Sequence, residues 1–203
     1  MSFVAWVRSN AEKLAIETFS VVLGIALAFA VNDWHTQRVH QQQARQVLAS
    51  IRAELVANRD LVRQHAEYHR AMADSAEALI TRTRGAAVPG GLGAIANYSG
   101  LHPTQVLDNA WQTARSTQAL ELISYDVAVG LSTTYAYQQR LVDLTRAFYA
   151  VSYGPAFSTG DIGALKSTWL YLGDAVANET EMIGRYDAQI ARLDSILGPA
   201  RGR

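Results

Sequence analysis

Residues 48–79 read LASIRAELVANRDLVRQHAEYHRAMADSAEAL and contain neither proline nor glycine. The residues of this stretch that recur at spacings of mostly three and four are Leu48, Ile51, Leu55, Asn58, Val62, His65, His69, Met72, Ala76 and Leu79. This spacing places them on one helix face, as in the heptad-like seam of a coiled coil. The seam is apolar at both ends and polar in its middle. The pattern predicts one long helix over about residues 35–84.

A second seam lies near the end of the chain. Gly154, Pro155 and residues 158–160 break the sequence before it, and a last helix is expected over about residues 161–197. Its residues at alternating spacings of four and three are Leu165, Trp169, Leu172, Val176, Glu179, Ile183, Tyr186, Ile190, Leu193 and Leu197. Two long helices with matching seams predict an elongated antiparallel bundle in which the last helix packs along the first.

The segment between the two seams should contain one loop and shorter helices. Residues 85–103 are rich in glycine and proline, which marks the principal loop. Helices should resume near Thr104, a plausible N-cap. We expect two short helices over residues 104–123, interrupted near Ser116 and Thr117. A longer helix over 126–152 should bury the residues Val127, Leu131, Tyr135, Leu141, Leu144, Phe148 and Val151.

Composition excludes several classes of function. The 203 residues include 18 basic and 18 acidic side chains, so the net charge is zero and the basic footprint of a nucleic-acid-binding protein is missing. Cysteine is absent, which excludes disulfides, thiolate metal sites and a cysteine nucleophile. We expect no nucleic-acid partner and no cofactor.

An apolar run lies before the first seam. Residues 18–32 read TFSVVLGIALAFAVN, with no charge between Glu17 and Asp33. With residues 14–16 this makes about 27 Å of helix, just enough to cross a bilayer. Trp6 and Trp34 flank the run as interface anchors. The predicted organisation is an N-terminal tail and transmembrane helix over 1–34, followed by an extramembrane helical bundle over 35–203.

A cleaved signal peptide is the alternative interpretation of this run. Arg8 and Lys13 precede it, and Ala28-Phe29-Ala30 fits the A-x-A pattern of a cleavage site. The helical pattern continues past residue 30, however, without the break that cleavage usually needs. We therefore favour a helix that stays in the membrane, with membrane lipid as a partner.

Glu17 is the acidic residue at the start of the span. It either lies at headgroup level, near Lys13, or works inside the membrane. Glu17, Val21, Gly24 and Ala28 share one helix face, and the last two form a small-xxx-small pair that lets membrane helices approach closely. This face is a candidate contact for a homo-oligomer or a membrane-protein complex.

These residues resemble a family of uncharacterised bacterial single-pass membrane proteins, known as a domain of unknown function. Glu17, Gly24 and the following GIALAFAVNDW are similar to the Gly-Ile-x-Ile-Ala-Leu-x-Ile-Asn-x-Trp signature of that family, with Asn32 and Trp34 on the pattern. A second block, AWQTARSTQALELISYD, resembles Trp or Phe followed by Ser-Ser-Gly-x-Leu-x-Leu-Ile. It contains Trp111, Leu120 and Ile123, with Gln118 where the family has glycine.

The resemblance covers residues 14–140 and implies an anchor plus helices, without an activity. Members often carry a basic N-terminal tail, which implies a cytoplasmic N-terminus and a bundle on the periplasmic side of the bacterial inner membrane.

Few residues suggest chemistry. His65 and His69, four apart, can face one metal ion from a single helix face, but a site needs further ligands. They are otherwise ordinary polar residues of the seam, or a pH-sensitive contact that weakens when both are protonated below about pH 6.5. Glu179 is either solvated or pairs in the core with His65, His69 or an arginine.

The leading hypothesis is a non-enzymatic accessory or scaffolding protein that oligomerises or binds a larger membrane complex. One alternative is an ion-coupled, energy-transducing subunit in which Glu17 exchanges protons within the membrane. A second is a metal-binding protein that uses His65 and His69. We expect no catalytic residues.

Overall fold

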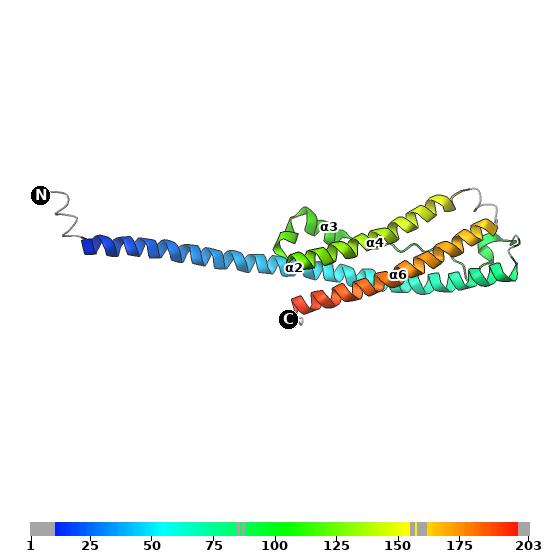
Figure 1. Cartoon of the computed structure of the whole chain (residues 1–203), viewed down its shortest axis with the longest axis horizontal. Coiled ribbons are helices and arrows are strands. Elements are labelled where there is room, and N and C mark those ends of the chain that lie inside the picture. Colours follow the sequence, from blue (N-terminus) through cyan, green and yellow to red (C-terminus); the bar gives the residue numbers. More distant parts are fainter. Residues whose placement is uncertain (1–10, 85, 87, 155–156, 158–161, 199–203) are drawn as a thin grey trace. The chain divides into compact units, whose positions relative to one another are not determined.

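The computed structural model describes residues 11–84, 86, 88–154, 157 and 162–198. Every regular element in these ranges is helical, in agreement with the predicted all-α fold (Figure 1). In chain order the elements are α2 (Ala11–Arg82), the 3₁₀ turn η1 (Gly91–Ala94), α3 (Asn109–Ser116), the 3₁₀ turn η2 (Ala119–Leu122), α4 (Tyr125–Ser152) and α6 (Ile162–Leu197).

Helix α2 runs through two structural units. The first unit is Met1–Ala44 and the second is Arg45–Arg203. The helix expected over residues 35–84 is present, and it begins upstream as part of the same 72-residue helix. No proline lies between residues 11 and 82 to interrupt the hydrogen bonds of its backbone.

The second unit is built around α2 and α6, which run antiparallel. Arg52 of α2 pairs with Asp194 of α6, and Arg63 pairs with Asp187 at 2.6 Å. As the residue number rises along α2, the partner on α6 falls, which confirms the predicted antiparallel packing. Exposed pairs of this kind contribute only about 0–1 kcal/mol each, so the buried seams carry most of the stability.

Both seams face the core, as expected. Nine of the ten residues of the first seam are buried, and His65 is half-buried. Six residues of the second seam are buried and four are half-buried. The apolar residues form two clusters, one around Leu55 and Tyr186 and the other around Met72 and Leu172.

Helix α4 completes the bundle beside α6 (Figure 1). Its predicted face is buried or half-buried except for Val151, which is 61% exposed, so the expectation for that residue was wrong. The buried face of α4 is centred near Thr134 and Gln138, two polar residues that the pattern did not include. At 3.6 residues per turn Val151 lies about 120° around the helix from that centre, because a heptad spacing drifts across a straight helix.

The chain between η1 and α3 has no regular secondary structure, and we call residues 98–108 the connector. Helices do not resume near Thr104 as expected: α3 begins at Asn109, after Asp108. Thr104 is not a cap but is buried, with 4% of its surface exposed. The two short helices expected over 104–123 are present as α3 and η2.

Candidate functional site

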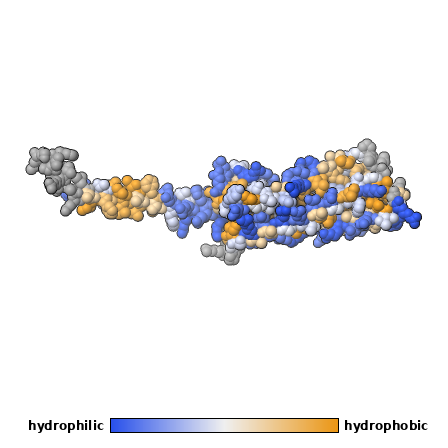
Figure 2. All heavy atoms as spheres, in the orientation of Figure 1, coloured by the Kyte–Doolittle hydropathy of each residue, from blue (hydrophilic) through white to orange (hydrophobic). Residues whose placement is uncertain are grey.

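The apolar part of α2 lies in the first unit and is exposed throughout. All residues from 15 to 38 are exposed, and the face of this helix seen in Figure 2 is largely apolar up to a polar stretch. Its exposed large apolar residues are Ile16, Phe19, Val21, Val22, Leu23, Ile25, Leu27, Phe29, Val31 and Trp34. One helix of the described residues is thus long and apolar enough to cross a membrane.

The predicted contact face belongs to this surface. Glu17, Val21, Gly24 and Ala28 are all exposed, and a Cβ built on Gly24 meets no atom within 4 Å. In the described part of the chain no residue covers this face, which leaves it accessible to a second helix.

Trp34, one of the two expected interface anchors, contacts an arginine of the same helix. The guanidinium of Arg38 lies 4.4 Å from the centre of the Trp34 ring, and 56% of Trp34 is exposed. The side chain thus carries a cation on its aromatic face, a pairing suited to a headgroup region. Asn32 is exposed on the same helix. Trp6 lies outside the described residues.

The second family-like block lies in the core of the second unit. The ring of Trp111 is buried and stacks on Tyr135, with ring centres 5.1 Å apart and planes 8° from parallel. Leu120 and Ile123 are half-buried against the same cluster. Gln118 has φ 57° and ψ 15°, so the left-handed turn forms at the position where the family has glycine.

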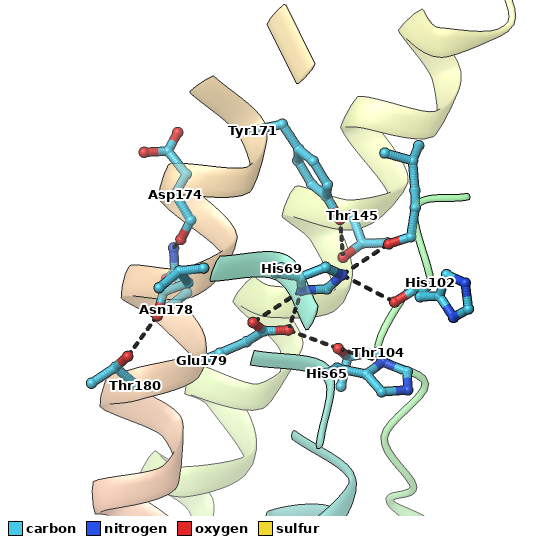
Figure 3. A network of polar contacts seen from close by, with 12 residues as sticks. His65, His69, His102, Thr104, Thr145, Tyr171, Asp174, Asn178, Glu179 and Thr180 are labelled. Carbon is cyan, nitrogen blue, oxygen red and sulfur yellow. Dashed lines mark hydrogen bonds and ion pairs between the residues drawn. The ribbon is translucent and has the colours of Figure 1, made fainter. Parts of the chain in front are cut away.

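An enclosed cluster of polar side chains lies around His69, between α2, the connector and α6 (Figure 3). His69 is 1% exposed and Glu179 is 0% exposed. The Nδ1 atom of His69 lies 2.9 Å and 3.0 Å from the two carboxylate oxygens of Glu179. Glu179 is therefore buried rather than solvated. The sequence left His65, His69 or an arginine as its possible partner, and in the structure the partner is His69.

The other ring nitrogen of His69 holds the connector. Nε2 donates to the carbonyl oxygen of Leu101 at 2.8 Å, and the carbonyl oxygen of His102 lies at 3.2 Å. Carbonyl oxygens only accept hydrogen bonds, so Nε2 must carry a proton. Both nitrogens of His69 are thus occupied by protein atoms, which leaves neither free to bind a metal.

Thr104 joins the same cluster from the connector. Its hydroxyl donates to Oε1 of Glu179 at 2.8 Å, so the Nδ1 atom of His65, 3.1 Å away, is the donor to the threonine oxygen. Thr104 also lines a surface pocket of about 450 Å³ together with Pro103 and Val142. No group of three or more His, Asp or Glu side chains in the described ranges is placed to hold a metal ion.

The two histidines respond to pH in opposite ways. Burial disfavours the protonated form of His69, but the hydrogen bond and charge of Glu179, with the two carbonyls, outweigh burial and raise its pKa. Burial, followed by the nearby charge of His69, lowers the pKa of His65. The expectation that protonation of both residues weakens the seam was therefore wrong for His69, because a carboxylate stabilises its charge.

Two further groups of buried or half-buried polar side chains hold the connector region. Asn58 hydrogen-bonds the backbone of Leu107 and the side chain of Gln138, whose Oε1 accepts from the hydroxyl of Tyr186 at 2.7 Å. The third group is centred on Glu54. Its Oε2 accepts from the backbone N–H of Ala110, and its Oε1 accepts from the hydroxyl of Tyr135.

These groups explain the polar middle of the first seam. A segment without regular secondary structure inside a helical bundle has N–H and C=O groups that no helix or sheet satisfies, and buried backbone groups need partners. Asn58 and His69 are those partners. Thr104 and Gln138 were missed from sequence. Gln138 had a usable signal, since it lies three residues from both Tyr135 and Leu141 on the buried face of α4.

The chemistry available to the His69 cluster is the holding of a proton and the binding of main-chain carbonyls.

No family model, curated protein or solved structure matches the chain.

Proposed function

We propose that the chain is a single-pass membrane protein whose helical bundle acts as a non-enzymatic accessory or scaffolding module, oligomerising or binding a larger membrane complex. The proposal includes a bacterial inner-membrane location with the bundle in the periplasm, as the family resemblance implies. It rests mainly on one observation: the apolar surface of α2 is exposed on a helix that continues into a folded bundle.

The energetic argument concerns the cost of leaving that surface in water. Ten large apolar side chains of residues 16–34 are 46–67% exposed. Burial of one such side chain is worth about 1.5–3 kcal/mol, so their combined exposure favours transfer into lipid or onto a partner. The segment has the length and flanking residues of a span.

The bundle supports a binding role over a catalytic one. Two of its acids are engaged by protein groups: the buried Glu179 by His69 and Thr104, and the half-buried Glu54 by Tyr135 and a backbone N–H. Such contacts fix the fold of the connector between the helices. A folded bundle that is tethered to the membrane presents its surface to partners in or beside that membrane, which is what a scaffold requires.

Membrane retention is tested with a charge in the span. In cells that express the full chain, wild type should stay in the membrane fraction through an alkaline carbonate wash and be released by detergent. Leu27→Arg places a charge at the centre of the apolar run, at a cost of about 2.5–3.5 kcal/mol, and should reduce retention. Gln43→Arg, an exposed position beyond the run, is the matched control. Release of wild type by carbonate alone would refute the anchor.

Orientation and assembly can be tested with single cysteines, because the chain has none of its own. A membrane-impermeant maleimide applied to intact spheroplasts should label Thr133→Cys, at an exposed position of α4, and should not label Ser9→Cys. The reverse result would place the bundle in the cytoplasm.

The contact face is tested by disulfide crosslinking within native membranes. Ala28→Cys lies on the face of Gly24, whereas Ala26→Cys lies about 160° away around the helix. We expect a crosslinked species from Ala28→Cys and far less from Ala26→Cys. Equal yields from the two variants would argue against this face. Monomer alone from both, with no co-purifying protein, would argue against the scaffold itself.

A further inference from the structure

The connector is held on the bundle by a cluster in which His69 and Glu179 share one proton. His69 bridges a carboxylate on α6 and two carbonyls on the connector, and Thr104 of the connector donates to that same carboxylate. Figure 3 shows the two contacts of His69 on opposite sides of its ring. One side chain thus couples the connector to both long helices.

The geometry sets the proton count. Nε2 faces acceptors only, and the threonine proton points to Glu179. Between Nδ1 and the carboxylate there must then be one proton, because two lone pairs 2.9 Å apart would repel. Whether that proton is drawn on nitrogen or on oxygen, the cluster is neutral with it and carries one negative charge without it. A net charge on groups that are 0–1% exposed is costly.

We propose that His69 and Glu179 form a proton-dependent latch, which holds the connector on the bundle while the proton is present and releases it when the proton is lost as pH rises. Loss of the proton leaves the carboxylate facing a bare nitrogen. The connector can then move away and admit water to the charged group. The connector residue Thr104 already lines a surface pocket, so this movement opens the cluster toward solvent.

Among the side chains that surround His69 in the described residues, Glu179 supplies the negative charge. From α2, the ring of His65 lies 6.1 Å away and that of Tyr68 lies 5.9 Å away, centre to centre. From the connector come the hydroxyl of Thr104 and the main chain of His102. The ring of His102 lies 4.5 Å from that of Tyr68, centre to centre, with the planes tilted by 48°. The titratable residues on α6 and α4 include Tyr171 and Tyr149, and both have pKa values raised by burial.

The expected effect has a defined direction. In the open state His69 has its ordinary pKa near 6.5, and in the latched state the pKa is higher. The latch is fully effective below pH 6.5 and is lost as pH rises through the latched-state pKa. Between these two values the opening constant increases by up to about tenfold per pH unit, since one proton is released on opening.

The experiment is hydrogen exchange by mass spectrometry on the full chain in detergent, from pH 6 to 9, with rates corrected for the intrinsic effect of pH. Protection of residues 98–108 should fall as pH rises, while protection of the middle of α4 stays constant. The imidazole of His69, followed by NMR, should titrate over the same range. Constant protection of the connector, or an equal loss throughout the bundle, would overturn the proposal.

Glu179→Gln provides a sharper test than removal of the side chain. The glutamine amide can donate to a neutral Nδ1 and still accept from Thr104, so the connector stays bound without the ionisable proton. The variant should fold, and its connector should keep its protection up to pH 9. Glu67→Gln, which removes an exposed carboxylate on the same helix as His69, should behave like wild type. An unchanged pH response in Glu179→Gln, or its disappearance in Glu67→Gln, would assign the response to another group.

Discussion

The side-chain amide of Asn58 forms two hydrogen bonds with the backbone of Leu107. Its Nδ2 donates to the carbonyl oxygen at 2.6 Å, and the N–H of Leu107 donates to its Oδ1 at 2.8 Å. Asn58 is 1% exposed. One buried amide therefore satisfies both polar backbone groups of a connector residue, as a neighbouring strand would in a sheet.

Replacement of Asn58 should be strongly destabilising. Asn58→Leu keeps an apolar side chain of similar size but leaves the N–H of Leu107 without its partner, and each buried unsatisfied group costs about 1–3 kcal/mol. We expect the free energy of unfolding to fall by about 1–3 kcal/mol in denaturant titration. Gln64→Leu, at an exposed position of α2, is the control and should change it by less than about 0.5 kcal/mol. Equal effects would mean that the connector contributes nothing to stability.

Gln118→Gly should stabilise the chain. The residue has a positive φ of 57°, which costs an L-residue about 1–2 kcal/mol and glycine almost nothing. Part of that gain is lost because glycine is freer in the unfolded chain, so the expected increase is up to about 1 kcal/mol. Ser132→Gly, at an exposed helical position of α4, should instead destabilise. A lower melting temperature for Gln118→Gly would show that the side chain makes a compensating contact.

Gly184→Ala should also stabilise, by about 0.5–1 kcal/mol. Gly184 lies within α6 at an exposed position, and an added Cβ meets no atom within 4 Å, so the higher helix propensity of alanine acts alone. Gly130→Ala in α4 is the comparison, because there the Cβ lies 2.8 Å from Nε2 of Gln189. Its gain should be smaller or negative. A greater stabilisation by Gly130→Ala than by Gly184→Ala would contradict the packing of α4 on α6.

The stability of the bundle should depend on pH with two opposed contributions. The pKa of His69 is raised, so its contribution is present below pH 6.5 and is lost as pH rises. The pKa of His65 is lowered, so its contribution is present above pH 6.5 and is lost as pH falls through the folded-state value. Together they place a maximum near pH 6.5 in the contribution of these two residues.

His65→Gln separates the two contributions. Melting temperatures of the variant relative to wild type should rise as pH is lowered from 6.5 to 5, because the disfavoured protonation is gone. On the alkaline side, the two proteins should lose stability in parallel. A variant that differs from wild type by the same amount at every pH would show that His65 does not titrate on unfolding in this range.

Local patterns of residues were sufficient to predict the long helices. The seams at spacings of three and four, the proline-free stretch from residue 11 to residue 82 and the glycine-rich loop led to an all-helical chain with antiparallel long helices. These features act within one or two turns, so they can be derived from the order of residues. The apolar run and its flanking tryptophans likewise led to a candidate span by length and composition alone.

The tertiary structure alone decided the path of the connector and the partners of the polar residues. Thr104 read locally as a helix cap, yet it donates to Glu179, 75 residues away in the chain. The same holds for the choice of His69 over His65 as the partner of that acid. Spacing places both histidines near one face of α2, but only the position of the connector backbone determines which ring is enclosed. Local preferences fix the direction of a side chain on its own helix, whereas burial and hydrogen-bond pairing depend on segments that folding brings together.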